Sequence, residues 1–293
     1  MNIRGRHNHR LRRLGELALD AAMLKGLIAR WSYRCGLHGR LGVTRYDVGV
    51  TREKGLITPL TVAFASDFHA GPTTHPGIFS SLFDALAEIQ PDVLLLGGDF
   101  VSCKADYADE LSDGLFRCQP PFGKYAVFGN HDLWVDDAKL TRLLTAAGVE
   151  VLVNRNVALP APFDRISVCG VDDPWTGNPD VVQAFNSARE IRIFLAHSPD
   201  GLLLLGNESF DVAFAGHTHG GQVAFRDGTP ILLPHGPLSR RYVHGKFPID
   251  GNGHLIVSRG VGCSTLPIRV NADPELVVCT IRTAHELSGS LSA

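Results

Sequence analysis

The stretch TVAFASDFHA, residues 61–70, contains the pattern on which the fold depends. An apolar run covers 61–66, and a short run of this kind predicts a buried strand. The run stops at Asp67, and His69 follows two residues later. Polar side chains that come directly after a buried strand lie at the edge of the sheet, where α/β proteins place their ligand sites.

Similar apolar runs recur along the chain and alternate with segments of helical periodicity. This alternation predicts an α/β fold whose internal strands are buried on both faces. After residue 215 the pattern changes to short strands and Gly/Pro turns without an evident helix, which indicates an antiparallel completion of a second sheet. The expected strands are 61–66, 92–96, 124–128, 165–169, 192–196 and 212–215, and the expected helices are 78–89, 107–117, 136–147 and 181–189.

The composition is that of a globular protein, and no linker divides the chain. Of its 293 residues, 44% are hydrophobic and 20% are charged, which excludes a largely disordered chain. No Pro/Gly/Ser-rich segment separates two domains. We therefore predict an N-terminal extension, 1–50, followed by one catalytic domain, 51–293.

The extension is basic, whereas the rest of the chain is acidic. Residues 1–45 hold ten Lys/Arg and two acids, although the net charge of the whole chain is only −2. Apolar residues at three- and four-residue steps from Leu14 to Trp31 predict an amphipathic helix. Two interpretations stay open: the helix packs on its own domain or a partner subunit, or residues 1–34 attach to an anionic membrane surface. The acidic body argues against a nucleic-acid partner.

Six cysteines are scattered without CxxC pairs, which predicts reduced thiols. Reduced thiols favour a cytoplasmic protein. The basic helix adds the alternative that the protein is peripheral on the inner face of the membrane. An export signal is not expected, because Glu16, Asp20 and Lys25 interrupt the segment after Arg12-Arg13.

Five strand ends carry side chains that can bind metals. Carboxylate, amide and imidazole groups together suit Mn, Fe, Zn or Co, and differ from the thiolate set of a structural zinc site. Two ions about 3.5–4 Å apart need a shared carboxylate, and an Asp on a tight Gly-Gly-Asp turn can reach both. Asp99 is our candidate for this bridge. The candidate ligands are Asp67, His69, Asp99, Asn130, His197, His217 and His219.

Each motif alone is weak, because a single His after a strand is more often structural. In order, however, the motifs DxH, GGD, GNHD, H and GHTH resemble the calcineurin-like metallophosphoesterase superfamily over residues 61 to about 282. The segments GHTHGGQ (216–222), VDDP (171–174) and SRGVG (258–262) resemble its bacterial YkuE/YaeI-like branch.

The resemblance implies a four-layer αββα sandwich of two mixed sheets flanked by helices. It also implies two divalent metal ions, with Asp67, His69, Asp99 and His219 around one and Asp99, Asn130, His197 and His217 around the other. His131 matches a non-ligand histidine that hydrogen-bonds the leaving oxygen, and Asp132 would orient it.

The resemblance further implies hydrolysis of a phosphodiester or pyrophosphate by a hydroxide that bridges the two metals. Some members of the branch are linked to cleavage of UDP-diacylglucosamine in lipid A synthesis, so a lipid-linked phosphate ester is a candidate substrate. Protein-phosphatase activity is disfavoured, because Phe100-Val101-Ser102-Cys103 stands where those enzymes carry an arginine. The alternatives are a phosphomonoesterase, a nuclease, or a non-catalytic scaffold of the same fold.

Two arginines near the C-terminus have two possible roles. Arg259 and Arg269 could contact a second phosphate or a sugar, or could pair with carboxylates inside the fold.

Overall fold

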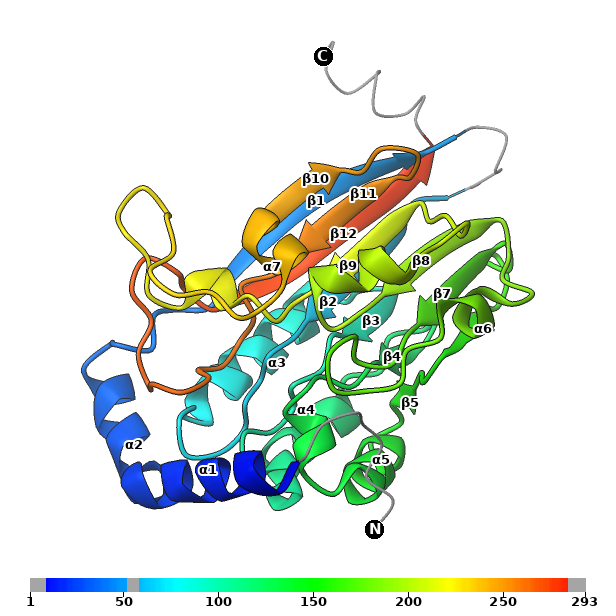
Figure 1. The fold of residues 1–293 in the computed structure, drawn as a ribbon. Coiled ribbons are helices and arrows are strands. Elements are labelled where there is room, and N and C mark those ends of the chain that lie inside the picture. The colour runs from blue at the N-terminus through cyan, green and yellow to red at the C-terminus, as the bar shows by residue number, and fades with distance from the viewer. Residues whose placement is uncertain (1–8, 52–57, 284–293) are drawn as a thin grey trace.

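Two six-stranded sheets pack face to face in a computed structural model that describes residues 9–51 and 58–283 (Figure 1). The first eight residues of the predicted membrane-binding segment, including Arg4 and Arg6, lie outside the described residues.

The first sheet has the order β1-β12-β2-β3-β4-β5. Its strands β2 to β5 are parallel, β12 is antiparallel to β2, and β1 is parallel to β12. The bounds are β1 Gly42–Val50, β2 Leu60–Ala65, β3 Val93–Leu96, β4 Lys124–Ala126, β5 Glu150–Val151 and β12 Glu275–Thr283.

The second sheet has the order β10-β11-β9-β8-β7-β6. Strands β7, β8, β9 and β11 are parallel, and the two edge strands β6 and β10 are antiparallel to their neighbours. The bounds are β6 Arg155–Ala158, β7 Ile166–Gly170, β8 Ile191–Leu195, β9 Val212–Ala215, β10 Gly245–Pro248 and β11 His254–Val257. Both sheets are mixed, as expected.

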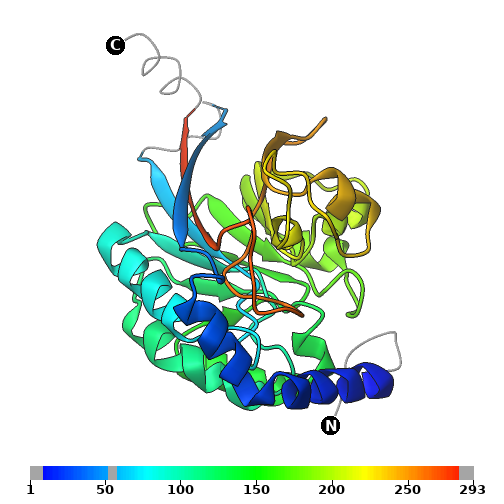
Figure 2. The same cartoon turned by 90° about the vertical axis from the view of Figure 1, so that its left-hand side faces the viewer.

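Helices cover the outer faces of the two sheets (Figures 1 and 2). The first sheet carries α3 Gly77–Ile89, α4 Asp109–Arg117 and α5 Asp137–Ala146. The second carries α6 Val181–Phe185, the 3₁₀ segment η5 Pro199–Leu204 and α7 Pro237–Arg241. Three further 3₁₀ segments are η3 Ala105–Ala108, η4 Asp132–Trp134 and η6 His219–Gly221.

Three hydrophobic cores separate these layers, and the alternation along β2 shows why. Ala63 and Ala65 face the core beneath α3 to α5, whereas Val62 and Phe64 face the core between the sheets. Successive strand residues point to opposite faces, so an internal strand must be apolar throughout. A third core lies between the second sheet and α6. The four-layer αββα prediction is therefore confirmed.

The N-terminal segment differs in two respects from the expected continuous helix. It forms α1 His9–Ala22 and α2 Leu27–Arg34, separated by η1 Leu24–Gly26. The break occurs because Leu24, Lys25 and Gly26 all have positive φ, which a continuous helix does not allow. Strand β1, which lies inside the predicted extension 1–50, pairs along its whole length with β12.

The C-terminal part only partly matches the expectation of a second-sheet completion. Strands β10 and β11 form the predicted antiparallel pair, but β12 returns to the first sheet beside β2. The unpredicted helix α7 begins with Pro237 in its first turn, where proline is favoured, and is too short to show helical periodicity.

None of the six cysteines, all of which lie in the described residues, forms a disulfide. Among the described residues, no helix combines the length and apolar character needed to cross a bilayer.

Candidate metal centre

The predicted ligands converge because the loops after neighbouring strands are hydrogen-bonded to one another. The amides of Asp67 and His69, after β2, donate to the carbonyls of Gly98 and Asp99, after β3, both at 2.9 Å. In the second sheet the amide of Gly216 donates to the carbonyl of His197 at 2.8 Å. Strand order thus brings together side chains from five separate segments.

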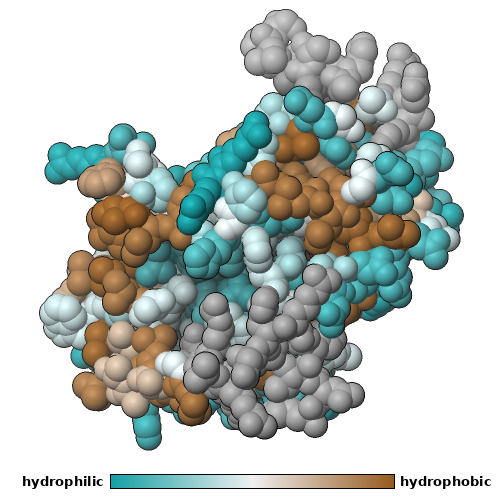
Figure 3. Space-filling view, viewed as in Figure 1, coloured by the Kyte–Doolittle hydropathy of each residue, from teal (hydrophilic) through white to brown (hydrophobic). Residues whose placement is uncertain are grey.

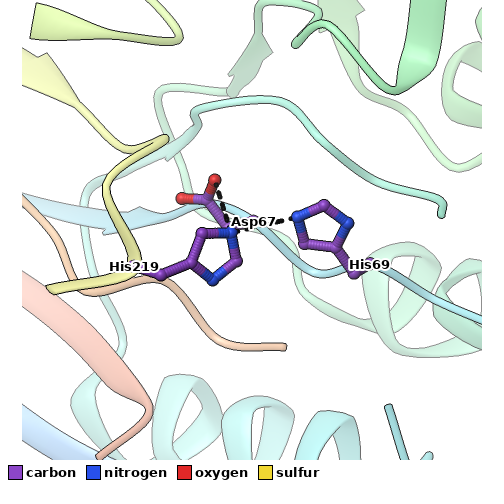
Figure 4. Close-up of side chains that lie close together, drawn as sticks. All are labelled: Asp67, His69 and His219. Atoms are coloured by element: carbon purple, nitrogen blue, oxygen red, sulfur yellow. Dashed lines mark hydrogen bonds and ion pairs between the residues drawn. The ribbon is translucent and has the colours of Figure 1, made fainter. Parts of the chain in front are cut away.

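Asp67, His69 and His219 form the first group (Figure 4). The His219 ring lies between the other two side chains: its Nε2 is 3.1 Å from His69 Nε2 and 3.5 Å from Asp67 Oδ1. Two imidazole nitrogens approach this closely only when a proton or a cation lies between their lone pairs. The geometry therefore suits a cation held by two imidazoles and a carboxylate.

Asp99, His197 and His217 form the second group. His197 Nε2 is 3.1 Å from His217 Nδ1 and 3.3 Å from Asp99 Oδ2. The same Asp99 oxygen is 3.5 Å from His69 Nε2 in the first group. One carboxylate oxygen thus faces both groups, which is the position that a bridging ligand needs.

Asn130 contributes an orphaned oxygen. Its Oδ1 is buried and has no hydrogen-bond partner in the structure. A buried, unpaired amide oxygen costs about 1–3 kcal/mol, and a cation bound there would remove this cost. The amide therefore fits the metal interpretation better than a purely structural one.

Hydrogen bonds fix which nitrogen of His197 is available to a metal. Its Nδ1 is 2.8 Å from the carbonyl oxygen of Gly97, which can only accept, so Nδ1 must carry the proton. Nε2, which faces Asp99 and His217, is then the ring nitrogen left for a metal. Outer contacts of this kind orient ligating histidines in metal sites.

Burial and charge set the protonation of the cluster. Burial lowers the pKa of His217 to about 3 and lowers the pKa of His69 and His219 well below the usual value, which keeps these rings neutral. Burial alone would raise the pKa of Asp99, but the positive charge of His197 outweighs it and holds that pKa well below its usual range. The negative charge of Asp99 in turn outweighs burial and raises the pKa of His197 well above its usual value, so a metal would have to displace one proton from His197.

His131 lies beside the cluster and, like His217, is only half-buried. Its amide donates to Asp99 Oδ1 at 2.8 Å, and its ring meets the His69 ring edge-on at 4.7 Å between centroids. It also falls within ligand distance of His69 and Asp99, so geometry alone allows a ligand as well as a proton donor.

Asp132 acts on the backbone of two loops. Its Oδ1 accepts from the amide of Phe100 at 2.8 Å, and its Oδ2 accepts from the amide of Gly129 at 2.9 Å. Both oxygens are thus used to join the loop after β3 to the loop after β4. The predicted orientation of His131 by Asp132 would therefore act through the backbone of the loop that carries His131.

The comparisons with known proteins agree with this geometry. The family model for calcineurin-like phosphoesterases matches residues 60–221, which is more than half of the chain. The chain belongs to this family.

Two bacterial relatives are similar over most of their length. The chain is 32% identical to the metallophosphoesterase YkuE of Bacillus subtilis (strain 168) over 204 residues, which are 68% of this chain and 70% of YkuE. It is 33% identical to the phosphodiesterase YaeI of Escherichia coli (strain K12) over 230 residues, which are 75% of this chain and 81% of YaeI.

A solved 5'-nucleotidase precursor from Thermus thermophilus is 14% identical with a TM-score of 0.45, and the match covers 80% of this chain and 58% of the nucleotidase chain. The family model and the relative named a phosphodiesterase make this protein a metallophosphoesterase, a hydrolase that acts on phosphate esters.

The backbone of this metallophosphoesterase is strained at its candidate ligands. Asp67, His69, Asp99, His217 and His219 all have positive φ, between 43° and 71°. Such conformations are costly for residues other than glycine and persist where the surrounding structure enforces them, as at functional sites.

Two residues that the ligand prediction did not include also contact the cluster. Arg269 is buried, its Nη2 lies 3.3 Å from His219 Nδ1, and it donates to the carbonyls of Gly262 and Ala272 at 2.9 and 2.8 Å. These carbonyl contacts account for the arginine, which was expected to meet phosphate or a carboxylate. Asp173 is buried beside His197 with an unpaired Oδ1. The only sequence signal for Asp173 was the segment VDDP (171–174), which contains it.

Proposed function

We propose that this protein hydrolyses phosphodiester or pyrophosphate bonds with the help of two divalent metal ions. The observation that carries the proposal is the position of Asp99 Oδ2, within 3.5 Å of nitrogens in both groups. Asp67, His69, Asp99 and His219 would hold one ion, and Asp99, Asn130, His197 and His217 the other. When bound, the ions supply Lewis acidity, which activates water and neutralises phosphate oxygens.

His131 supplies the proton for the leaving group in this proposal. Its backbone amide donates to Asp99, while its half-buried ring lies next to Trp134 at 4.4 Å between centroids. A proton donor must reach the departing oxygen from the side on which substrate enters. Asp132 holds the loop that sets this position.

The relative from Escherichia coli that is named a phosphodiesterase supports a diester substrate. The chain also carries Phe100-Val101-Ser102-Cys103 where protein phosphatases of the superfamily place an arginine. A phosphomonoester needs such a cation more than a diester does because of its second charge. Within this class, a nucleotide-linked glycolipid such as UDP-diacylglucosamine is our lipid-linked candidate.

Metal reconstitution tests the proposal. Protein stripped with a chelator and reloaded separately with Mn, Fe, Zn or Co should bind close to two ions per chain and regain hydrolysis of bis(p-nitrophenyl) phosphate. Asp99→Ala should lose both metal and activity. Full activity with one ion per chain would overturn the dinuclear site.

A substrate panel then separates the remaining alternatives. Bis(p-nitrophenyl) phosphate, p-nitrophenyl phosphate, single-stranded DNA and UDP-diacylglucosamine distinguish a diesterase, a monoesterase, a nuclease and an enzyme of glycolipids. No turnover of any of them by metal-loaded protein would favour the non-catalytic scaffold.

A further inference from the structure

Three segments far apart in the sequence present large apolar side chains to solvent on one side of the molecule. The first is the α1–α2 region, where Leu24, Leu27 and Trp31 are exposed, Trp31 by 64%. The second is the loop after η6, where Leu232 is 77% exposed, and the third is the loop that carries Leu266. We call Leu24, Leu27, Trp31, Phe225, Leu232 and Leu266 the apolar rim.

Hydrogen bonds join these segments into one surface. Ser32 of α2 donates to the carbonyl of Pro267, and the amide of Arg269 donates to Leu37 at 2.7 Å. The Gln222 side chain donates to the Leu266 carbonyl at 2.7 Å. In Figure 3, apolar side chains gather along the left-hand edge, over α2 and the loops drawn in yellow and orange in Figure 1.

The same contacts tie the rim to the candidate metal centre. Gln222 follows His219 by three residues, and Arg269, which joins Leu37, touches the His219 ring. On another side, buried Asp20 of α1 accepts a hydrogen bond from Tyr107 at 2.9 Å and pairs with Lys104. The N-terminal helices therefore pack on the domain with one face and leave the face that carries Leu24, Leu27 and Trp31 open to solvent.

The charge around the rim has one sign in its helical part. From Met23 to Arg45 the sequence contains Lys25, Arg30, Arg34, Arg40 and Arg45 but no acid. Lys25, Arg30 and Arg34 are exposed beside Leu24, Leu27 and Trp31. Apolar side chains flanked by cations match the surface of an anionic bilayer. The apolar side chains insert at the level of the headgroups, and the anionic lipids attract the cations.

We propose that the apolar rim docks this protein on the surface of an anionic lipid bilayer, with the candidate metal centre beside the membrane. A second copy of the chain is a poorer occupant, because two copies of a cationic surface repel each other when they pair about a two-fold axis. The inference does not depend on which phosphate ester is hydrolysed.

Glutamate substitutions on two segments test the rim in the full chain. Trp31→Glu and Leu232→Glu alter exposed side chains, so the fold should tolerate both; Val182→Glu, an equally exposed apolar residue of α6, is the matched control. The readout is co-sedimentation with vesicles of phosphatidylglycerol and phosphatidylcholine at low salt. Each rim variant should bind roughly ten-fold more weakly or worse, while Val182→Glu binds as the wild type does.

Charge is tested by salt and by Arg34→Glu, with the exposed Arg189→Glu as control. Raising the salt concentration and replacing Arg34 should both weaken binding, since the attraction acts within a Debye length. Hydrolysis of bis(p-nitrophenyl) phosphate without vesicles should be unchanged in every variant, which separates docking from the proposed activity.

Three results would overturn the proposal. In the first, the wild-type protein does not bind the vesicles at low salt. In the second, Leu232→Glu and Val182→Glu weaken vesicle binding equally. In the third, the protein does not bind vesicles but self-associates in sedimentation equilibrium, and the rim variants abolish this self-association. The last result would assign the rim to a second copy.

Discussion

Gly129→Ala should disable the metal centre while leaving the fold in place. Gly129 directly precedes Asn130, and its φ is not positive, so its backbone accepts alanine. The added Cβ, however, would lie 2.2 Å from Asp99 Oδ1, and 2.7 Å from both the backbone nitrogen of Asp99 and His197 Cε1. Ordinary van der Waals contact begins at 3.4 Å, so the Asp99 oxygen must retreat by about 1.2 Å.

The size of the effect follows from this displacement. A shift of ~1 Å at catalytic groups can lower a rate by ~10²-fold, and overpacking a tight site costs about 1–3 kcal/mol of stability. Because Asp99 faces both groups of ligands, we expect kcat/KM for bis(p-nitrophenyl) phosphate to fall by ~10²-fold or more, with fewer than two ions retained per chain.

The assay is metal analysis and steady-state kinetics on the reconstituted variant, with thermal unfolding to verify the fold. Gly42→Ala is the matched control, because the nearest atom to its added Cβ is 3.9 Å away. If Gly129→Ala keeps two ions and its kcat/KM stays within a few-fold of the Gly42→Ala value, Asp99 does not have the role that we assign to it.

Two further predictions address proton transfer and acid stability. His131→Ala should retain both metal ions and lose ~10²–10⁴-fold in kcat, the usual range for general acid catalysis; equal loss of metal in His131→Ala and Asp99→Ala would make His131 a ligand. Burial lowers the pKa of His38 to about 4, and its ring nitrogens contact Ser32 and the amide of His75 at 3.3 and 3.2 Å. Since the unfolded chain takes up this proton first, the stability that neutral His38 contributes is full above about pH 6.5 and is lost as pH falls toward about 4. Unfolding free energies measured over this range should decline less steeply in His38→Gln, and identical slopes would show that His38 is not responsible.

Local sequence was enough to predict an α/β fold with buried strands and the residues that gather at the centre. Buried strands such as Val93–Leu96 are apolar on both faces, which makes them recognisable in the sequence. The polar residues that come after these strands are of the types that bind metals, which made them candidate ligands. The family motifs added the four-layer arrangement, which three separate hydrophobic cores confirm. The ligand assignment itself stays a prediction until metal is bound and measured.

Only the tertiary structure decided how distant segments meet. Nothing near β12 shows that it pairs with β2 of the first sheet, because its burial is satisfied equally well in either sheet. His69 and His219 are 150 positions apart, yet their ring nitrogens lie 3.1 Å apart because two sheets place their strand ends at one edge. Arg269 and Asp173 lie beside this cluster for the same reason. The segments of Trp31 and Leu232 likewise belong to one rim because packing between elements brings them to the same side. Periodicity fixes which face of an element is buried, whereas packing between elements fixes what that face meets.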